Sequence, residues 1–295
     1  MKFDIDRYII KNHDTEDFNI PLKDEYKHHL TVCAHETKDI SQYQNIIDWI
    51  ELGKRIKNKP IEPIYHIGCA HVLDGDFGHI RLIDTMGCSL DIVNAARVSL
   101  NKFSEEWNAK DAKLLKFLIL NGHTSPLEMA EFKFEVYCPL FIARQWFRHR
   151  TWSFNERSRR YTSEDIKFYI PKIYRKQSSK NLQASEGVWD AGSNHDIEHA
   201  IRAKTRDCFD TYNQLISMDV CREQARMILP QNMMTKFIAK VDGNNLMKFV
   251  ILRQAEDAQA EIRQYADAIV FLTQRYIKEV WETLFKMLGI DFKPL

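Results

Sequence analysis

Residues 131–138 alternate strictly between apolar and polar side chains, and this alternation constrains the fold more than any other part of the sequence. Successive side chains of a β-strand point to opposite faces of a sheet, so the pattern predicts a strand with one buried face. Residues 233–241 alternate in the same way and predict a second strand. Helical patterns complete an expected α/β (α+β) fold and cover residues 89–97, 111–121, 196–218, 220–229 and 245–276, the last as one long helix or two abutting ones.

The chain has 295 residues, enough for one large domain or for a moderate domain with an appendage. Residues 1–77 are rich in Asn, Asp, Lys and His, and their one clear helical pattern follows Ser41. We therefore expect an N-terminal extension of unknown role at residues 1–77, followed by a main domain at residues 78–295.

The composition and the N-terminal sequence narrow the class of protein. No apolar run is long enough to span a bilayer, and residues 1–20 lack the apolar stretch of a secretory signal. The six cysteines are scattered without a Cys-x-x-Cys pair, as expected for reduced thiols in a cytoplasm. The formal net charge of +1 argues against a general nucleic-acid coat. We expect a cytoplasmic protein without a membrane or nucleic-acid partner.

Residues 144–161 hold six arginines, a histidine and a glutamate within eighteen positions. Guanidinium groups bind phosphates and planar carbonyl groups bidentately, so this local excess of cations indicates a site for a small anionic ligand. Pro139 suits the first turn of a helix that runs into this block, which would place Gln145, Arg148 and His149 on one face. Beyond it, we expect residues 153–158 to form a loop whose polar side chains face the ligand.

The stretch Arg148-His-Arg-x-x-Ser-x-Asn-Glu-x-Ser-x-Arg-Tyr161 resembles the signature of the flavin-dependent thymidylate synthases. The match is long, ungapped and rich in unusual residues. Other segments that fit the wording of this family are residues 94–99, 122–128, 141–147, 222–230 and 252–263. The resemblance covers residues 78–285 and does not extend to residues 1–77.

This resemblance implies a mixed or antiparallel central sheet flanked by helices, in a homotetramer whose active sites are shared between subunits. In such enzymes reduced FAD carries a one-carbon unit from methylenetetrahydrofolate to C5 of dUMP, and NADPH reduces the flavin. The product is dTMP. The expected cofactor is therefore FAD, with methylenetetrahydrofolate and NADPH as co-substrates.

By position, the resemblance implies that Arg253 is the catalytic residue and lies against the uracil edge. The residues implied to bind dUMP are Gln145, Arg148, Glu156, Arg157, Ser158, Arg159, Arg160, Arg253 and, from another subunit, Arg226. Those implied to bind FAD are Ser99, His123, Ser125, Arg148, His149, Arg150, Glu156, Asp242, Asn244 and Lys248. The chain departs from the family pattern in two places: Asp242-Gly-Asn244 stands where many members have Asn-x-Arg, and Asp257 replaces a common histidine.

The chemistry of these residue types agrees with the roles in dUMP binding and catalysis that the resemblance implies. A nucleotide phosphate carries about two negative charges, which Arg160, Arg226 and Ser158 can neutralise and hydrogen-bond. Uracil C5 is a poor nucleophile, and a fixed guanidinium such as Arg253 makes the ring more enolate-like by stabilising an N3 anion. No protein nucleophile is then required. The chain has no Gly-x-Gly-x-x-Gly, so FAD should not bind in a Rossmann crevice.

Several alternatives stay open. Arg253 could pair with Asp257 on an exposed helix face. Cys138 lies on the buried face of its strand and is expected to pack as a small hydrophobe rather than act as a nucleophile. His195 and His199 lack a third ligand, so no metal is expected. The alternative functions are another C5 modification of a pyrimidine nucleotide, such as hydroxymethylation, and a nucleic-acid-binding module built on residues 144–160.

Overall fold

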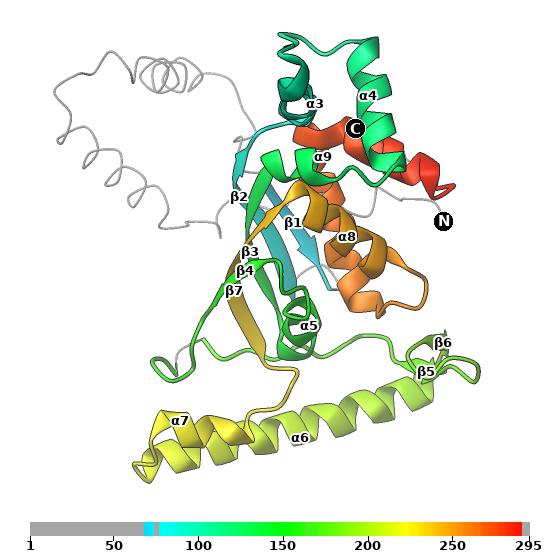
Figure 1. Ribbon diagram of the computed structural model, residues 1–295. Helices are drawn as coiled ribbons and strands as arrows, with labels where there is room; N and C mark the ends of the chain where they lie inside the picture. Colours follow the sequence, from blue (N-terminus) through cyan, green and yellow to red (C-terminus); the bar gives the residue numbers. More distant parts are fainter. Residues whose placement is uncertain (1–67, 74–76, 164, 291–295) are drawn as a thin grey trace, which may run out of the picture. The chain divides into compact units, whose positions relative to one another are not determined.

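The computed structural model describes residues 68–73, 77–163 and 165–290, which include a five-stranded sheet of order β1-β2-β3-β7-β4 (Figure 1). Each neighbouring pair of strands is antiparallel. The strands are β1 Cys69–Val72, β2 Gly78–Met86, β3 Glu131–Pro139, β4 Ser153–Glu156 and β7 Met234–Asp242. The predicted fold class is confirmed, with β3 and β7 at the two alternating segments.

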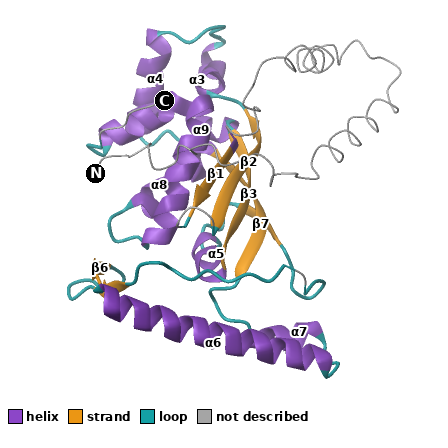
Figure 2. Ribbon diagram, turned by 180° about the vertical axis from the view of Figure 1, so that it is seen from behind, coloured by secondary structure: helices purple, strands orange, loops and turns teal. Residues whose placement is uncertain are grey.

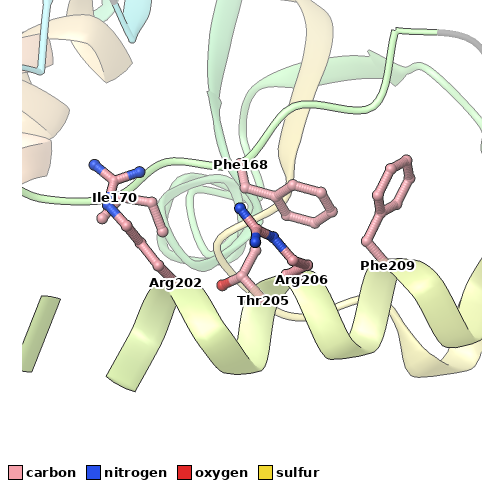
Figure 3. Close-up of a pocket in the computed structure, with 6 residues that line it drawn as sticks. All are labelled: Phe168, Ile170, Arg202, Thr205, Arg206 and Phe209. Carbon is pink, nitrogen blue, oxygen red and sulfur yellow. The ribbon is translucent and has the colours of Figure 1, made fainter. Parts of the chain in front are cut away.

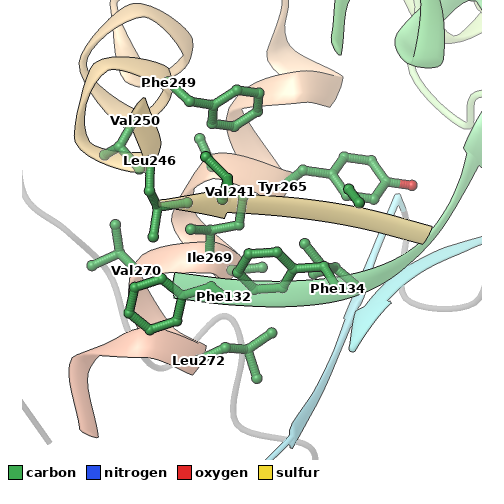
Figure 4. Packing of buried hydrophobic residues seen from close by; sticks show 14 of the residues in the cluster. Phe132, Phe134, Val241, Leu246, Phe249, Val250, Tyr265, Ile269, Val270 and Leu272 are labelled. Atoms are coloured by element: carbon green, nitrogen blue, oxygen red, sulfur yellow. The ribbon is translucent and has the colours of Figure 1, made fainter. Parts of the chain in front are cut away.

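The alternation of β3 decides where the core lies. Phe132, Phe134, Val136 and Cys138 are fully buried, whereas the side chains between them are polar and lie on the opposite face. Helices α8 (Gly243–Gln254) and α9 (Ala260–Met287) cover the apolar face (Figure 2). Figure 4 shows the side chains that they contribute beside β3 and β7, including Leu246, Phe249, Tyr265, Ile269 and Leu272.

Cys138 acts as a packed hydrophobe, as predicted. Its side chain is fully buried, and burial together with the nearby Glu156 raises the pKa of the thiol well above its usual value. A thiol with a raised pKa carries little thiolate and is a weak nucleophile.

The remaining helices are α3 Ser89–Arg97, η5 Val98–Leu100, α4 Ala109–Leu120, η6 Ser125–Met129, α5 Leu140–Trp146, α6 Ala191–Ser217, α7 Arg222–Ala225 and η7 Arg226–Ile228. The region predicted as one or two helices at residues 245–276 is two, because α8 ends at Gln254 and α9 starts at Ala260. Among the described residues, no helix combines the length and apolar character that crossing a membrane requires.

Helix α5 is shorter than predicted. It ends at Trp146 instead of running through the arginine block. Trp146 and Trp152 are both buried and contact each other edge to face, with ring centroids 5.8 Å apart. The backbone N–H of Trp152 donates to the carbonyl of His149 at 3.1 Å, which closes the turn between them. Burying both indole rings in one core requires the chain to turn here, so the predicted helical face does not form.

Residues 153–156 are also not a loop. They form strand β4, which pairs with β7 from Ser153 opposite Lys240 to Glu156 opposite Phe237. Phe154 packs against the core and contacts Phe147 and Phe237, which anchors this edge strand. A separate two-stranded hairpin is formed by β5 (Arg175–Gln177) and β6 (Ser185–Val188).

The sheet begins before the expected domain boundary at residue 78. Strand β1 pairs with β2 from Cys69 opposite Arg81 to Val72 opposite Gly78. Residues 69–72, which we placed in the extension, are therefore an edge strand of the sheet. The helix predicted after Ser41 and the rest of residues 1–67 lie outside the described residues, and the role of the extension stays open.

Candidate active site

Arg253 lies in the last turn of α8 and is held by two residues of the arginine block. Its Nε donates to His149 Nε2 at 3.0 Å, and its Nη2 donates to the backbone carbonyl of Gln145 at 3.1 Å. No ion pair joins Arg253 to Asp257 in the described part of the chain, so the alternative of an exposed i, i+4 pair is wrong. The structure therefore brings together Gln145, His149 and Arg253, although α5 ends before it can align them.

The side chain of Gln145 is fixed by a residue that sequence reasoning missed. Gln145 Nε2 donates to Gln259 Oε1, and Gln259 is the N-cap residue of α9. Gln259 lies within residues 252–263, one of the segments that resemble the flavin-dependent thymidylate synthases. That resemblance was the signal that could have pointed to it. The backbone carbonyl of Gln145 therefore binds the guanidinium of Arg253, while the side chain of Gln145 is bound by Gln259 at the start of α9.

His149 must be neutral at the nitrogen that faces Arg253. Because Nε2 accepts a hydrogen bond from a guanidinium, the ring proton resides on Nδ1. Burial and the neighbouring charge of Arg253 lower the pKa of His149 from 6.5 to about 4. Both effects disfavour the imidazolium, so the contact with Arg253 persists throughout the neutral pH range.

The titration of His149 tests this contact. We expect NMR of the folded protein to give a pKa near 4, rising towards 6.5 in Arg253→Ala as one of its two causes disappears. The folded-state pKa lies below the unfolded value, so the contribution of His149 to stability is complete above pH 6.5. It declines as the pH falls from 6.5 to about 4, where only the unfolded chain takes up the proton. A wild-type pKa near 6.5 would contradict both the burial of this ring and its contact with Arg253.

Residues 156–160 follow β4 along the edge of the sheet. Glu156 is exposed and accepts a hydrogen bond from Thr235 Oγ1 at 2.7 Å. Arg157 pairs with Asp165 at 3.5 Å, and Arg159 is buried and donates to the backbone carbonyl of Asp165 at 3.0 Å. These two arginines therefore hold residue 165 against this segment.

Two further residues of the same segment are half-buried Ser158 and exposed Arg160. Ser158 Oγ accepts the backbone N–H of Arg160 at 3.2 Å, which forms a tight hydroxyl turn. The Arg160 guanidinium is exposed and lies 5.7 Å from the ring centroid of Tyr161. Ser158 and Arg160 thus leave a hydroxyl and a cation available to an anion, whereas Arg159 does not.

Several residues expected to bind FAD lie around η5, η6 and the first turn of α8. Ser99, His123 and Ser125 are exposed. Asn244 is buried, and its Nδ2 donates to Glu128 Oε1 at 3.1 Å, which links α8 to η6. Asp242 caps α8 by accepting the backbone N–H of Asn245 at 2.9 Å. Asp242 and Asn244 thus fix the start of the helix.

Helix α8 connects these residues with Arg253. A side chain at Gly243 would place its Cβ 2.7 Å from the carbonyl oxygen of Leu127, so only glycine lets the first turn pack against η6. Arg253 lies in the last turn of the same helix. At 1.5 Å per residue, the helix is about 18 Å long. Asp242, Asn244 and η6 therefore lie at one end of this rigid element, and Arg253 lies at the other.

The residues present suit a flavin dinucleotide. Arg148, Arg150 and Lys248 are exposed, and none of them forms an ion pair with a residue that the structure describes. Free cations of this kind bind the pyrophosphate and the anionic form of a reduced flavin. Asn244 Oδ1 is buried and has no hydrogen-bond donor within the described ranges, so an acceptor is also available near η6.

Arg226 and one cavity lie apart from Arg253. Arg226 belongs to η7, is exposed, and donates from Nε to the carbonyl of Glu223 at 3.4 Å. A cavity of about 300 Å³ lies between α6 and the segment before Pro171 (Figure 3). It is lined by Phe168, Ile170, Arg202, Thr205, Arg206 and Phe209, none of which was predicted to bind a ligand.

Comparisons with known proteins identify the family. A family model described as thymidylate synthase complementing protein matches residues 81–277. The chain belongs to the flavin-dependent thymidylate synthase family. The flavin-dependent thymidylate synthase of Thermus thermophilus is 44% identical over 206 residues, which cover 70% of this chain and 75% of that protein. That of Anaplasma marginale is 38% identical over 232 residues, or 78% of each protein.

A solved structure shares the fold with this flavin-dependent thymidylate synthase homologue. The UMP/dUMP methylase PolB from Streptomyces cacaoi, crystallised with 5-Br UMP, aligns with a TM-score of 0.64 and 26% identity. The alignment covers 71% of this chain and 94% of that one. The resemblance inferred from residues 148–161 is confirmed, and the matched range includes every candidate site residue named above.

Proposed function

We propose that the chain converts dUMP to dTMP, with FAD as cofactor, methylenetetrahydrofolate as one-carbon donor and NADPH as reductant. The observation that carries the proposal is Arg253, held by His149 and Gln145 at the end of α8 beside the exposed cation Arg148. Membership of the flavin-dependent thymidylate synthase family supports it, as does the likeness to a UMP/dUMP methylase.

Arg253 is the residue that we assign to activation of the base. Two of its nitrogens, Nε and Nη2, donate to His149 and to the Gln145 carbonyl, while Nη1 has no partner among the described residues. The guanidinium is thus oriented in advance and keeps donors for a planar carbonyl edge. Stabilising negative charge on N3 and the adjacent carbonyl oxygens raises the electron density at C5. Gln145, fixed by Gln259, would orient the same base.

Neutral His149 has a positioning role in this scheme. Because its Nε2 is an acceptor, it orients Arg253 without adding a second positive charge beside it. Burial helps to keep the imidazole neutral, as the pKa of about 4 indicates. We assign no proton transfer to this ring.

The phosphate would be bound by the segment after β4. Ser158 and Arg160 offer a hydroxyl and an exposed guanidinium, and Glu156 is free to accept from a ribose hydroxyl on its unpaired oxygen. Arg226 lies on η7 without a carboxylate partner in the described chain. We propose that Arg226 reaches the phosphate of a neighbouring subunit in a homotetramer.

FAD would be held by Ser99, His123, Ser125, Arg148, Arg150 and Lys248, around a helix start fixed by Asp242 and Asn244. When bound and reduced, it supplies the hydride that takes the transferred carbon to the methyl level. The chain's own contribution is binding and orientation, since cations and hydroxyls favour the anionic reduced form and the pyrophosphate.

Ser158→Ala should weaken dUMP binding without abolishing turnover. The substitution removes one hydrogen bond to a charged group, worth about 1.5–3 kcal/mol, and it also opens the turn to Arg160. Isothermal titration with dUMP and steady-state rates would separate the two effects. Complete loss of turnover with normal dUMP binding would instead mark Ser158 as a nucleophile.

The proposed function is tested by absorption spectroscopy of the purified protein with added FAD, followed by titration with dUMP. Flavin bands that shift on addition of dUMP would place both ligands in one site. A parallel titration with UMP would show whether the ribose 2′-hydroxyl is tolerated. The absence of flavin uptake would contradict the proposal.

Two alternative functions are separated by further measurements. With labelled methylenetetrahydrofolate, the label ends in a methyl group for a thymidylate synthase and in an alcohol for a hydroxymethylase. A nucleic-acid-binding module would take up no flavin and would bind oligonucleotides with an affinity that falls steeply with salt. The family membership favours the synthase.

A further inference from the structure

The segment that carries Ser99 is not anchored by apolar burial. Residues 98–103 are all exposed, and three of them are large apolar side chains, Val98, Leu100 and Phe103, with exposures between 66% and 75%. Exposed apolar side chains contribute nothing to holding a loop in one conformation. The backbone of η5 is closed locally by the N–H of Asn101, which donates to the carbonyl of Val98 at 3.1 Å. The side-chain contacts that hold this segment against the rest of the domain lie at its two ends.

Such contacts converge on Asp111 in the first turn of α4. Asp111 is fully buried, and one of its carboxylate oxygens, Oδ1, pairs with Nη1 of Arg97, the last residue of α3. Its Oδ2 accepts the backbone N–H of Asn108 at 2.8 Å. Burial alone would raise the pKa of Asp111, but hydrogen bonds from Arg97, Asn108 and Ser104 outweigh it and lower the pKa.

Ser104 ties the far end of the segment to the same pair. Its hydroxyl accepts from Arg97 Nη1 at 2.8 Å and donates to Asp111 Oδ1 at 3.0 Å. Asn94 completes the connection, because its side chain donates to the carbonyl of Ser104 at 2.9 Å and accepts the N–H of Ser104 at 2.9 Å. Residues 97 and 104 are thus fixed on either side of the exposed segment.

We propose that Asp111, acting through Arg97 and Ser104, is a positioning residue that holds residues 98–103 as a preformed surface for the cofactor. This inference rests on the proposed function, in which Ser99 contacts FAD. Asp111 itself is buried and touches no ligand. Its carboxylate fixes the segment, so that Ser99 presents a hydroxyl, and Val98 and Leu100 present apolar groups, to the planar ring of the flavin. Because the segment is already ordered, it loses little conformational entropy when the cofactor binds.

The test compares Asp111→Asn with wild type in the full chain, by hydrogen–deuterium exchange of residues 98–104 and by the Kd for FAD. We expect both the exchange of this segment and the Kd to rise at least about tenfold, since a charge-assisted hydrogen bond is lost. Ser104→Ala removes only the bridging hydroxyl. It should act in the same direction to a smaller extent, and it tests the proposal if Asp111→Asn does not fold.

The matched control is Leu115→Ala, which removes a buried side chain one turn further along α4 and none of these hydrogen bonds. It should lower Tm but leave the exchange of residues 98–104 and the Kd for FAD unchanged. Unchanged exchange in Asp111→Asn, or an equal loss of FAD affinity in Leu115→Ala, would overturn the inference. If wild type itself binds no FAD, the proposed function fails, and the exchange measurement still decides whether Asp111 fixes the segment.

Discussion

Arg253→Ala is expected to lower the rate of dTMP formation by about 10²–10³-fold or more, the range found when one preorganised donor is removed from an active site. Hydrogen bonds to His149 and to the carbonyl of Gln145 fix the orientation of the guanidinium at this end of α8. Flavin binding should largely remain, because the substitution removes none of the residues assigned to FAD, and Asp242 and Asn244 lie at the other end of the helix. Steady-state turnover and the Kd for FAD give the two readouts.

Two further variants test whether the loss of turnover is specific to the guanidinium of Arg253. Arg253→Lys keeps the charge but loses the fork that contacts both His149 and Gln145, so it should recover little of the rate. Arg275→Ala removes an exposed arginine of α9 and should leave turnover unchanged. Turnover near the wild-type rate in Arg253→Ala would exclude this residue as the group that activates the base.

Trp146→Ala is expected to have the largest effect on stability, about 3–5 kcal/mol of the free energy of unfolding. Trp146 is fully buried at the end of α5. Its ring contacts four aromatic side chains at centroid distances between 4.8 and 5.8 Å: Trp152, Phe237, Phe249 and Tyr265. Removing it leaves a cavity between β7, α8 and α9, next to the residue that follows Gln145 in the chain. Denaturant unfolding at fixed protein concentration measures the change.

The control for size and residue type is Trp189→Ala, since Trp189 is 41% exposed and contacts Lys176 through a cation–π interaction. That variant should lose no more than about 1 kcal/mol. Trp146→Phe should lose less than Trp146→Ala, because an aromatic ring stays in place and the buried indole N–H has no acceptor among the described residues. Equal losses for Trp146→Ala and Trp189→Ala would contradict the importance of this aromatic cluster.

The strands and helices that face the core were predictable because burial leaves a period in the sequence. The alternation of residues 131–138 gave the buried face of β3 correctly, and α4, whose N-cap is Asn108, spans Ala109–Leu120, close to the expected residues 111–121. The errors arose where two tertiary contacts competed with a local pattern. Trp146 and Trp152 end α5 early, and Phe154 draws residues 153–156 into the sheet.

The candidate site was predictable in its residue types but not in its contacts. Arg253 and His149 are 104 positions apart, and no periodicity relates two side chains at that separation. Gln259 escaped notice for the same reason, because its partner Gln145 is 114 positions away. Arg226 illustrates a different limit, because we propose that it serves a neighbouring subunit, and no carboxylate of the described residues pairs with it to mark it as part of a site.

The length of helix α8 sets the position of Arg253 relative to η6. Its start is locked to η6 through Gly243 and Asn244, and its last turn presents Arg253. Inserting one residue would turn everything beyond it by about 100° and advance it by 1.5 Å. Arg253 would then point away from His149 while every side chain of the site was still present. The activation of the base that we propose for Arg253 therefore depends on the number of residues in this helix as well as on the arginine itself.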